Sequence, residues 1–102
     1  MGLFNRSEKI DLTKKLSPNE LKATTYALYY TVNKAGDSEG RQLADLMVSG
    51  RRRWLFPVEY DYFVSAVDTM IQIMEHKKKS EGLTPDLPQE LLYDLTSARR
   101  TL

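Results

Sequence analysis

The longest regular pattern in the chain is an alternation of apolar and polar positions that begins after Pro57. Its apolar positions recur every three or four residues, which is the spacing of one face of an α-helix. The apolar face holds Tyr60, Phe63, Val64, Val67, Met70, Ile71 and Met74, and the opposite face holds Asp61, Ser65, Asp68, Gln72 and Glu75. The pattern predicts a helix over residues 57–78, with Lys77, Lys78 and Lys79 at the end where the helix dipole favours cations.

A second helix is predicted to begin after Ser17. The Ser17 hydroxyl can accept from a free amide, Pro18 occupies a position that needs no donor, and Glu20 can complete a capping box. Gly36 follows the end of the pattern near Lys34, where a glycine in the left-handed conformation commonly ends a helix. We therefore expect a helix of about five turns between these signals.

This second helix has apolar residues on two nearly opposite faces. One face holds Leu21, Leu28, Val32 and Ala35, and the other holds Ala23, Tyr26, Ala27 and Tyr30. Such a helix either lies at the centre of its own bundle or uses one of its apolar faces to bind a partner. We favour the central position because helices with two apolar faces are usually buried. The spacing of Tyr26 and Tyr30 by four residues predicts an aromatic contact.

Two shorter helices complete the prediction. Asp37 and Ser38 can cap a helix that carries Leu43, Leu46 and Met47 and ends at Ser49-Gly50, and a last helix begins near Pro88. The last helix is expected to bury Leu91, Leu95 and Ala98 and to end at Arg99-Arg100. We expect an all-α bundle of three main helices plus one shorter helix, formed by residues 17–102, with an N-terminal tail, 1–16, docked on it.

The conformation of the tail is left open, since Ile10 and Leu12 alternate like a short strand, while Leu3 and Phe4 are suited to dock on the bundle. The length of 102 residues fits one domain. No segment approaches the roughly 20 apolar residues of a membrane helix, and the chain has no Cys. We expect a soluble protein of a reducing compartment, with the cytoplasm as the default location.

Catalytic and metal-binding patterns are weak in this chain. His76 is the single histidine and lies on the polar side of the long helix, so a nucleophile would lack a matched base. Asp61, Asp68 and Glu75 recur every seven residues, which is typical of a solvated helix face. We therefore predict a protein that is not an enzyme, with no cofactor and no metal.

The best candidate for a working surface is the run Arg51, Arg52 and Arg53 beside Trp54, in a predicted joint between two helices. Trp, Tyr and Arg are enriched at the hot spots of protein interfaces. We predict a partner-binding surface formed by this run together with Tyr26, Tyr30 and Tyr62. The structural alternative is a loop whose arginines pair with Asp45, Glu59 or Asp61 while Trp54 and Phe56 pack into the core.

Residues 42–49 resemble the first helix and turn of helix-turn-helix DNA-binding domains, with Leu43-Ala44 in the helix and Val48-Ser49 in the turn. The family's glycine before the valine is missing here. The resemblance implies that Arg51, Arg52 and Arg53 contact nucleic acid. Two observations argue against it: acidic residues begin the next helix, and 15 Lys and Arg are balanced by 14 Asp and Glu.

The sequence thus favours a small helical protein that acts by protein–protein interaction, as an adaptor, regulator or assembly subunit, with a protein partner or with a second copy of itself. Six Tyr in so short a chain exceed what a small core readily buries, which favours an interface. A helix-turn-helix-like regulator that binds nucleic acid through the arginine run is the alternative.

Overall fold

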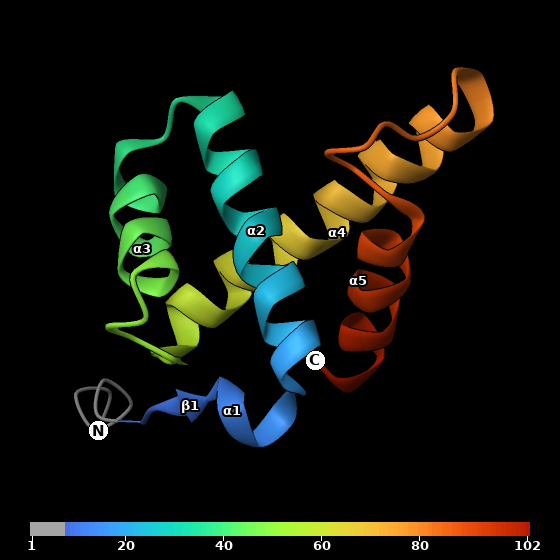
Figure 1. The fold of residues 1–102 in the computed structure, drawn as a ribbon. Helices are drawn as coiled ribbons and strands as arrows, with labels where there is room; N and C mark the ends of the chain where they lie inside the picture. Colours follow the sequence, from blue (N-terminus) through green and yellow to red (C-terminus); the bar gives the residue numbers. More distant parts are fainter. Residues whose placement is uncertain (1–7) are drawn as a thin grey trace.

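The computed structural model describes residues 8–102 and confirms an all-α architecture (Figure 1). The described residues form five helices and one two-stranded antiparallel sheet. In chain order the elements are β1 (Ile10–Asp11), α1 (Leu12–Lys15), α2 (Pro18–Ala35), α3 (Ser38–Val48), β2 (Trp54–Leu55), α4 (Pro57–Ser80) and α5 (Gln89–Thr101). The predicted docking of Leu3 and Phe4 concerns residues outside the described part.

Helix α2 occupies the centre of the fold, as its two apolar faces predicted. It contacts α3, α4 and α5. Its first turn is held by the predicted capping box, in which the Ser17 amide donates to Glu20 Oε1 at 2.9 Å and the Glu20 amide donates to Ser17 Oγ at 3.2 Å. Gly36 ends the helix at φ 70°, in the left-handed region that favours glycine.

The helices form two layers. Helices α3, α2 and α5 lie side by side with α2 in the middle, and α4 crosses behind α2 (Figure 1). Between the layers lies the core, which includes Leu28 and Val32 from α2 and Phe63 and Met70 from α4, each at most 1% exposed. Away from α4, α2 carries the side chains of Lys22 and Tyr29, which are exposed within the described residues.

Helix α4 follows the pattern that predicted it and extends two residues further, to Ser80. Phe63, Val67, Met70 and Met74 are fully buried, whereas Val64 and Ile71 are partly buried at the edge of the apolar face. On the polar side, Asp68 accepts a 2.7 Å hydrogen bond from Arg99 Nε of α5.

Residues 10–16 are a structural part of the bundle. Ile10 pairs with Leu55 and Asp11 with Trp54 in the small sheet, and the Leu12 amide donates to the Arg53 carbonyl at 2.9 Å. Leu12 is fully buried in the core. Ile10 therefore lies in a short strand, whereas Leu12 begins a turn of helix that was not predicted.

Helix α5 is rotated slightly from the orientation that the sequence predicted. Leu92, Leu95 and Ala98 are buried, whereas Leu91 is only partly buried because it lies beside a groove between α5 and α2. Ser97 Oγ donates to Glu20 Oε2 at 2.6 Å, which ties α5 to the capped end of α2. This hydrogen bond gives the two helices a defined register.

Candidate functional site

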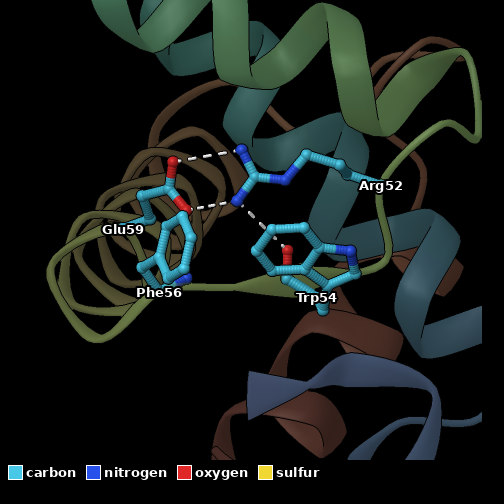
Figure 2. A network of polar contacts seen from close by, with 4 residues as sticks. All are labelled: Arg52, Trp54, Phe56 and Glu59. Atoms are coloured by element: carbon cyan, nitrogen blue, oxygen red, sulfur yellow. Dashed lines mark hydrogen bonds and ion pairs between the residues drawn. The ribbon is translucent and has the colours of Figure 1, made fainter. Parts of the chain in front are cut away.

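The segment after α3 carries the predicted arginine run, and Arg52 turns inward instead of facing solvent. Its guanidinium forms a bidentate ion pair with the Glu59 carboxylate of α4, with Nη1 at 3.2 Å from Oε2 and Nη2 bonded to Oε1 (Figure 2). Arg52 Nη2 also donates to the Trp54 carbonyl at 3.4 Å, and the Phe56 amide donates to Glu59 Oε1 at 3.0 Å. Arg52 therefore fastens the loop to the start of α4.

The aromatic residues of the loop add to this arrangement. The Arg52 guanidinium lies 4.1 Å from the Trp54 ring centroid, and Lys9 Nζ lies 4.4 Å from the same centroid. The Trp54 and Phe56 rings meet edge to face with centroids 5.0 Å apart. Both aromatic side chains are only partly buried, and the fully buried residue of the loop is Leu55 between them.

Burial raises the pKa of Glu59, but hydrogen bonds from Arg52 and from the Phe56 amide, together with the Arg52 charge, outweigh this effect and leave the pKa below its usual value. The carboxylate is therefore ionised under ordinary conditions and the ion pair is complete. One predicted pairing, Arg52 with Glu59, is thus present. Arg51 and Arg53 are exposed, and neither forms an ion pair within residues 8–102.

A groove of about 540 Å³ runs between the first half of α2 and the end of α3. Its lining is mostly apolar and includes Leu21 and Tyr29 of α2 and Met47 and Val48 of α3. Tyr29 is 42% exposed and Val48 is 57% exposed, which is unusual for large apolar side chains that lie close together. We call this surface the α2–α3 groove.

The charged residues that line the α2–α3 groove are all cations: Lys22, Arg52 and Arg53. Because Arg52 is neutralised by Glu59, the effective positive charge comes from Lys22 and Arg53. The groove therefore combines apolar walls with a basic rim. Such a surface is suited to bind an apolar side chain that is flanked by carboxylates.

A second, smaller groove of about 410 Å³ lies on the other side of α2, against α5 and the turn before it. Asp86, Glu90 and Asp94 line it, so its charge is opposite to that of the first groove. Burial and the nearby Asp86 charge raise the pKa of Tyr26, which together with Lys22 belongs to both grooves. We call this surface the α2–α5 groove.

The structure separates the predicted site residues into two groups. Tyr26, Arg52 and Arg53 line the α2–α3 groove, and Tyr30 contacts Tyr26 with ring centroids 6.2 Å apart, as predicted. Arg51, Trp54 and Tyr62 are not part of the groove lining.

Tyr62 has a separate role at the start of α3. Its hydroxyl donates to Asp37 Oδ2 at 2.5 Å, and the other oxygen of Asp37 accepts from the amides of Glu39 and Gly40. Burial, followed by the hydrogen bond to Asp37, raises the pKa of Tyr62 to about 12. Tyr62, a residue of α4, therefore supports the N-terminal cap of a different helix, α3.

Tyr29 and Val48 were missed by sequence reasoning. Tyr29 lies on the polar stripe between the two apolar faces of α2, three residues after Tyr26. This spacing makes the two side chains neighbours on the helix surface, and it is the sequence signal that could have identified Tyr29. Val48 ends the helix just before Ser49-Gly50 and carries no periodic signal of its own.

The helix-turn-helix resemblance is limited to α3. Residues 49–56, which include β2, separate α3 from α4, whereas the family's turn spans three or four residues. The three arginines lie in this connection and not on a helix. Among the residues that the structure describes, His76 is exposed, and no three His, Asp or Glu side chains gather to hold a metal ion.

No described helix combines the length and the apolar character needed to cross a membrane. Comparison with family models, with curated proteins and with solved structures gave no match to this chain. Function is therefore inferred from the chemistry of the surface formed by α3, α2 and α5.

Proposed function

We propose that this protein is a non-enzymatic interaction protein, acting as an adaptor, regulator or assembly subunit, and that it binds a protein surface through the α2–α3 groove. The observation that supports this proposal is the pair of exposed apolar side chains, Tyr29 and Val48, beside Lys22 and Arg53, which form no ion pair within residues 8–102. Exposed apolar surface with a polar edge is typical of protein interfaces.

The chemistry of the groove also favours binding over catalysis. Its lining, all of it within the described residues, contains neither a carboxylate nor an imidazole that would act as a general base. Tyr26 and Tyr29 supply large rigid rings at a low cost in conformational entropy, and Arg53 offers a planar fork for a partner's carboxylate. These side chains are those expected at the centre of a binding site.

The proposal is tested by placing a photo-crosslinking amino acid at Val48 in the cells that make the protein. Val58, which is 78% exposed at the start of α4 and does not line the groove, is the matched control. We expect covalent protein adducts from position 48 that are absent from position 58. Equal adducts at both positions, or no protein adduct at position 48, would contradict a binding role for the groove.

Nucleic-acid binding through Arg51 and Arg53 is the alternative function, and it is supported by the exposure of both side chains. Its test is gel-shift titration at low salt with short duplex and single-stranded probes, since phosphate contacts weaken steeply with salt. Binding that is lost in Arg51→Ala with Arg53→Ala, but kept in Val48→Asp, would favour this alternative over the groove proposal.

A further inference from the structure

The outer face of the three-helix layer carries two grooves of opposite charge on either side of one ridge. The ridge is the exposed side of α2, and Lys22 and Tyr26 on it line both grooves. The α2–α3 groove has a basic rim, to which Arg53 contributes, and the α2–α5 groove carries Asp86 and Asp94. Both grooves flank the same half of α2, so they lie level with each other along the layer.

We propose that this face binds a second copy of the same chain in a two-fold dimer, with α5 of each copy lying in the α2–α3 groove of the other. The inference rests on the proposed function and names its partner. A two-fold axis lying in the interface parallel to α2 exchanges the two sides of the face. The basic groove of one copy then meets the acidic side of its partner, and the same contact occurs twice.

The shape of the face agrees with this arrangement. Helices α3, α2 and α5 lie side by side (Figure 1), and the two grooves lie between neighbouring helices of this layer. Shifting the axis from α2 toward α5 places α5 of the partner in the α2–α3 groove and α2 of the partner in the α2–α5 groove. Each groove is then filled by a helix, which is the usual way in which helical surfaces pack.

Charge supports a second copy as the occupant. Lys22, Arg53, Asp86, Glu90 and Asp94 are at least partly exposed, and within residues 8–102 none of them forms an ion pair. The two-fold arrangement brings the two cations opposite the three carboxylates. Unpaired charges of both signs on one face are therefore neutralised by the partner, which favours this orientation over its competitors.

Exposed apolar side chains occur on each of the three helices of this layer. Five large apolar side chains in the described part are exposed, and three of them, Tyr29, Val48 and Tyr93, belong to α2, α3 and α5. Tyr93 is 68% exposed on α5, the helix that the proposal inserts into the partner's groove. Burial of these three side chains in both copies supplies the apolar centre of the interface.

Charge-exchange variants test the dimer directly. One variant, Lys22→Glu with Arg53→Glu, makes the basic groove acidic, and the other, Asp86→Lys with Asp94→Lys, makes the acidic side basic. Glu90 is left unchanged because it lies in the first turn of α5, where an acidic residue stabilises the helix. Circular dichroism and thermal unfolding of each variant verify that the fold is kept.

Sedimentation velocity over a range of concentrations is the measurement. We expect the wild type to dimerise and each variant alone to dimerise at least about tenfold more weakly, because like charges then face each other. An equimolar mixture of the two variants restores both contacts, so it is expected to form a heterodimer with an affinity close to that of the wild type. This recovery would not occur if either variant were simply misfolded.

Three outcomes overturn the dimer: a wild type that stays monomeric, variants that dimerise as tightly as the wild type, or a mixture that fails to recover. The photo-crosslinking at Val48 separates this failure from that of the proposed function. A monomer that forms adducts from position 48 with a different protein contradicts the dimer alone. A monomer without protein adducts at that position contradicts both.

Discussion

Arg52 belongs to the arginine run, but its contacts with neighbouring residues keep its side chain mostly buried. Its guanidinium is held by Glu59, by the Trp54 carbonyl and by two aromatic rings, and only 16% of its side chain is exposed. A buried charge of this kind is stable only while its partner remains ionised and in place. The Arg52–Glu59 pair therefore fixes the loop that carries Arg51 and Arg53.

We predict that Glu59→Gln lowers the free energy of unfolding by about 1–2 kcal/mol. The loss is smaller than for a fully buried pair because a quarter of the Glu59 side chain is exposed. Urea denaturation measures it, with Glu75→Gln as an exposed control on the same helix. A loss at Glu59 no larger than that at Glu75 would mean that the ion pair contributes nothing to stability.

The same pair predicts a dependence of stability on pH. The pKa of Glu59 is lower in the folded protein than its usual 4.5, so its contribution is present above that pH and is lost as the pH falls through the folded pKa. Glu20 and Asp37 also have lowered pKa values, so protonation of several carboxylates destabilises the protein in acid. The Glu59→Gln variant lacks one of these carboxylates. Its free energy of unfolding is therefore expected to fall less between neutral and acid pH than that of the wild type.

Gly40 allows a close approach among three helices. A Cβ atom at this position would lie 2.7 Å from Val32 Cγ1 of α2 and would also clash with the Tyr62 hydroxyl of α4. Tyr62 would have to move away from Asp37, which caps α3. The first turn of α3 thus depends on the absence of a side chain at Gly40.

We predict that Gly40→Ala destabilises the protein by about 1–3 kcal/mol through overpacking, although alanine favours a helix by about 1 kcal/mol over glycine. Thermal unfolding measures the change, and Glu39→Ala, at the exposed neighbouring position, is the control. The tyrosine with a pKa of about 12 should also titrate at lower pH in Gly40→Ala, as followed by ultraviolet absorbance. A stabilised Gly40→Ala protein would contradict the close contact.

At the scale of single elements, the start of α2 combines a helix cap with a link between helices. Glu20 accepts from the Ser17 amide through one oxygen and from the Ser97 hydroxyl of α5 through the other. The hydrogen bond from Ser97, followed by that from the Ser17 amide, holds the pKa of Glu20 below its usual value. Glu20 therefore links the capping box of α2 to α5.

This double role predicts that Glu20→Ala costs more stability than Ser17→Ala. Loss of the Ser17 cap is expected to cost about 1 kcal/mol, and Glu20→Ala loses in addition the bond to Ser97, another ~1 kcal/mol. Chemical denaturation of both variants, and of Ser97→Ala, gives the three values. If Ser17→Ala and Glu20→Ala lowered the free energy of unfolding equally, the hydrogen bond from Ser97 of α5 would contribute nothing to stability.

The sequence predicted the elements well where a signal is local. The capping box at Ser17, the left-handed Gly36 and the apolar face of α4 depend on residues within a few positions of one another, and each is present in the structure. The inward turn of Arg52 depends on Glu59, which reaches it only after the chain has formed β2 and entered α4. The sequence offered Glu59 as one of three acidic partners for the arginines, but local spacing could not select it among them.

The two grooves could not be predicted from sequence patterns, for a related reason. The α2–α3 groove arises because α2 and α3 pack in a way that leaves Tyr29 and Val48 exposed, and the packing of two helices is not encoded in the period of either one. The sequence identified Tyr26, Arg52 and Arg53 from their residue types. It did not indicate that Tyr62 serves the cap of α3 instead.

At the scale of the whole molecule, the long helix α4 divides the protein into a covered side and an open side. It closes the core behind α2, and the open side of the three-helix layer retains both grooves. The total charge is nearly balanced, at +1 for the full chain, yet charges of opposite sign are sorted to the two sides of α2. Sorting of this kind on a neutral protein supports oriented contact between copies more than attraction to a polyanion.

The sorted charges predict how the proposed dimer responds to salt. The contacts between Lys22 or Arg53 and the acidic side of the partner lie at the rim, where added ions screen them. Raising the salt from about 0.05 M to about 0.5 M shortens the screening length several-fold, so the wild-type dimer is expected to weaken by about tenfold, as measured by sedimentation.

The variant Lys22→Glu with Arg53→Glu reverses the sign of this response. Its own dimer holds like charges together, so salt relieves a repulsion and is expected to strengthen that dimer while the wild type weakens. The equimolar mixture with Asp86→Lys and Asp94→Lys regains the wild-type direction, because attraction is restored at both contacts. A wild-type dimer that strengthens with salt would indicate that apolar contact alone holds the copies together, and that the charges flanking α2 do not set their orientation.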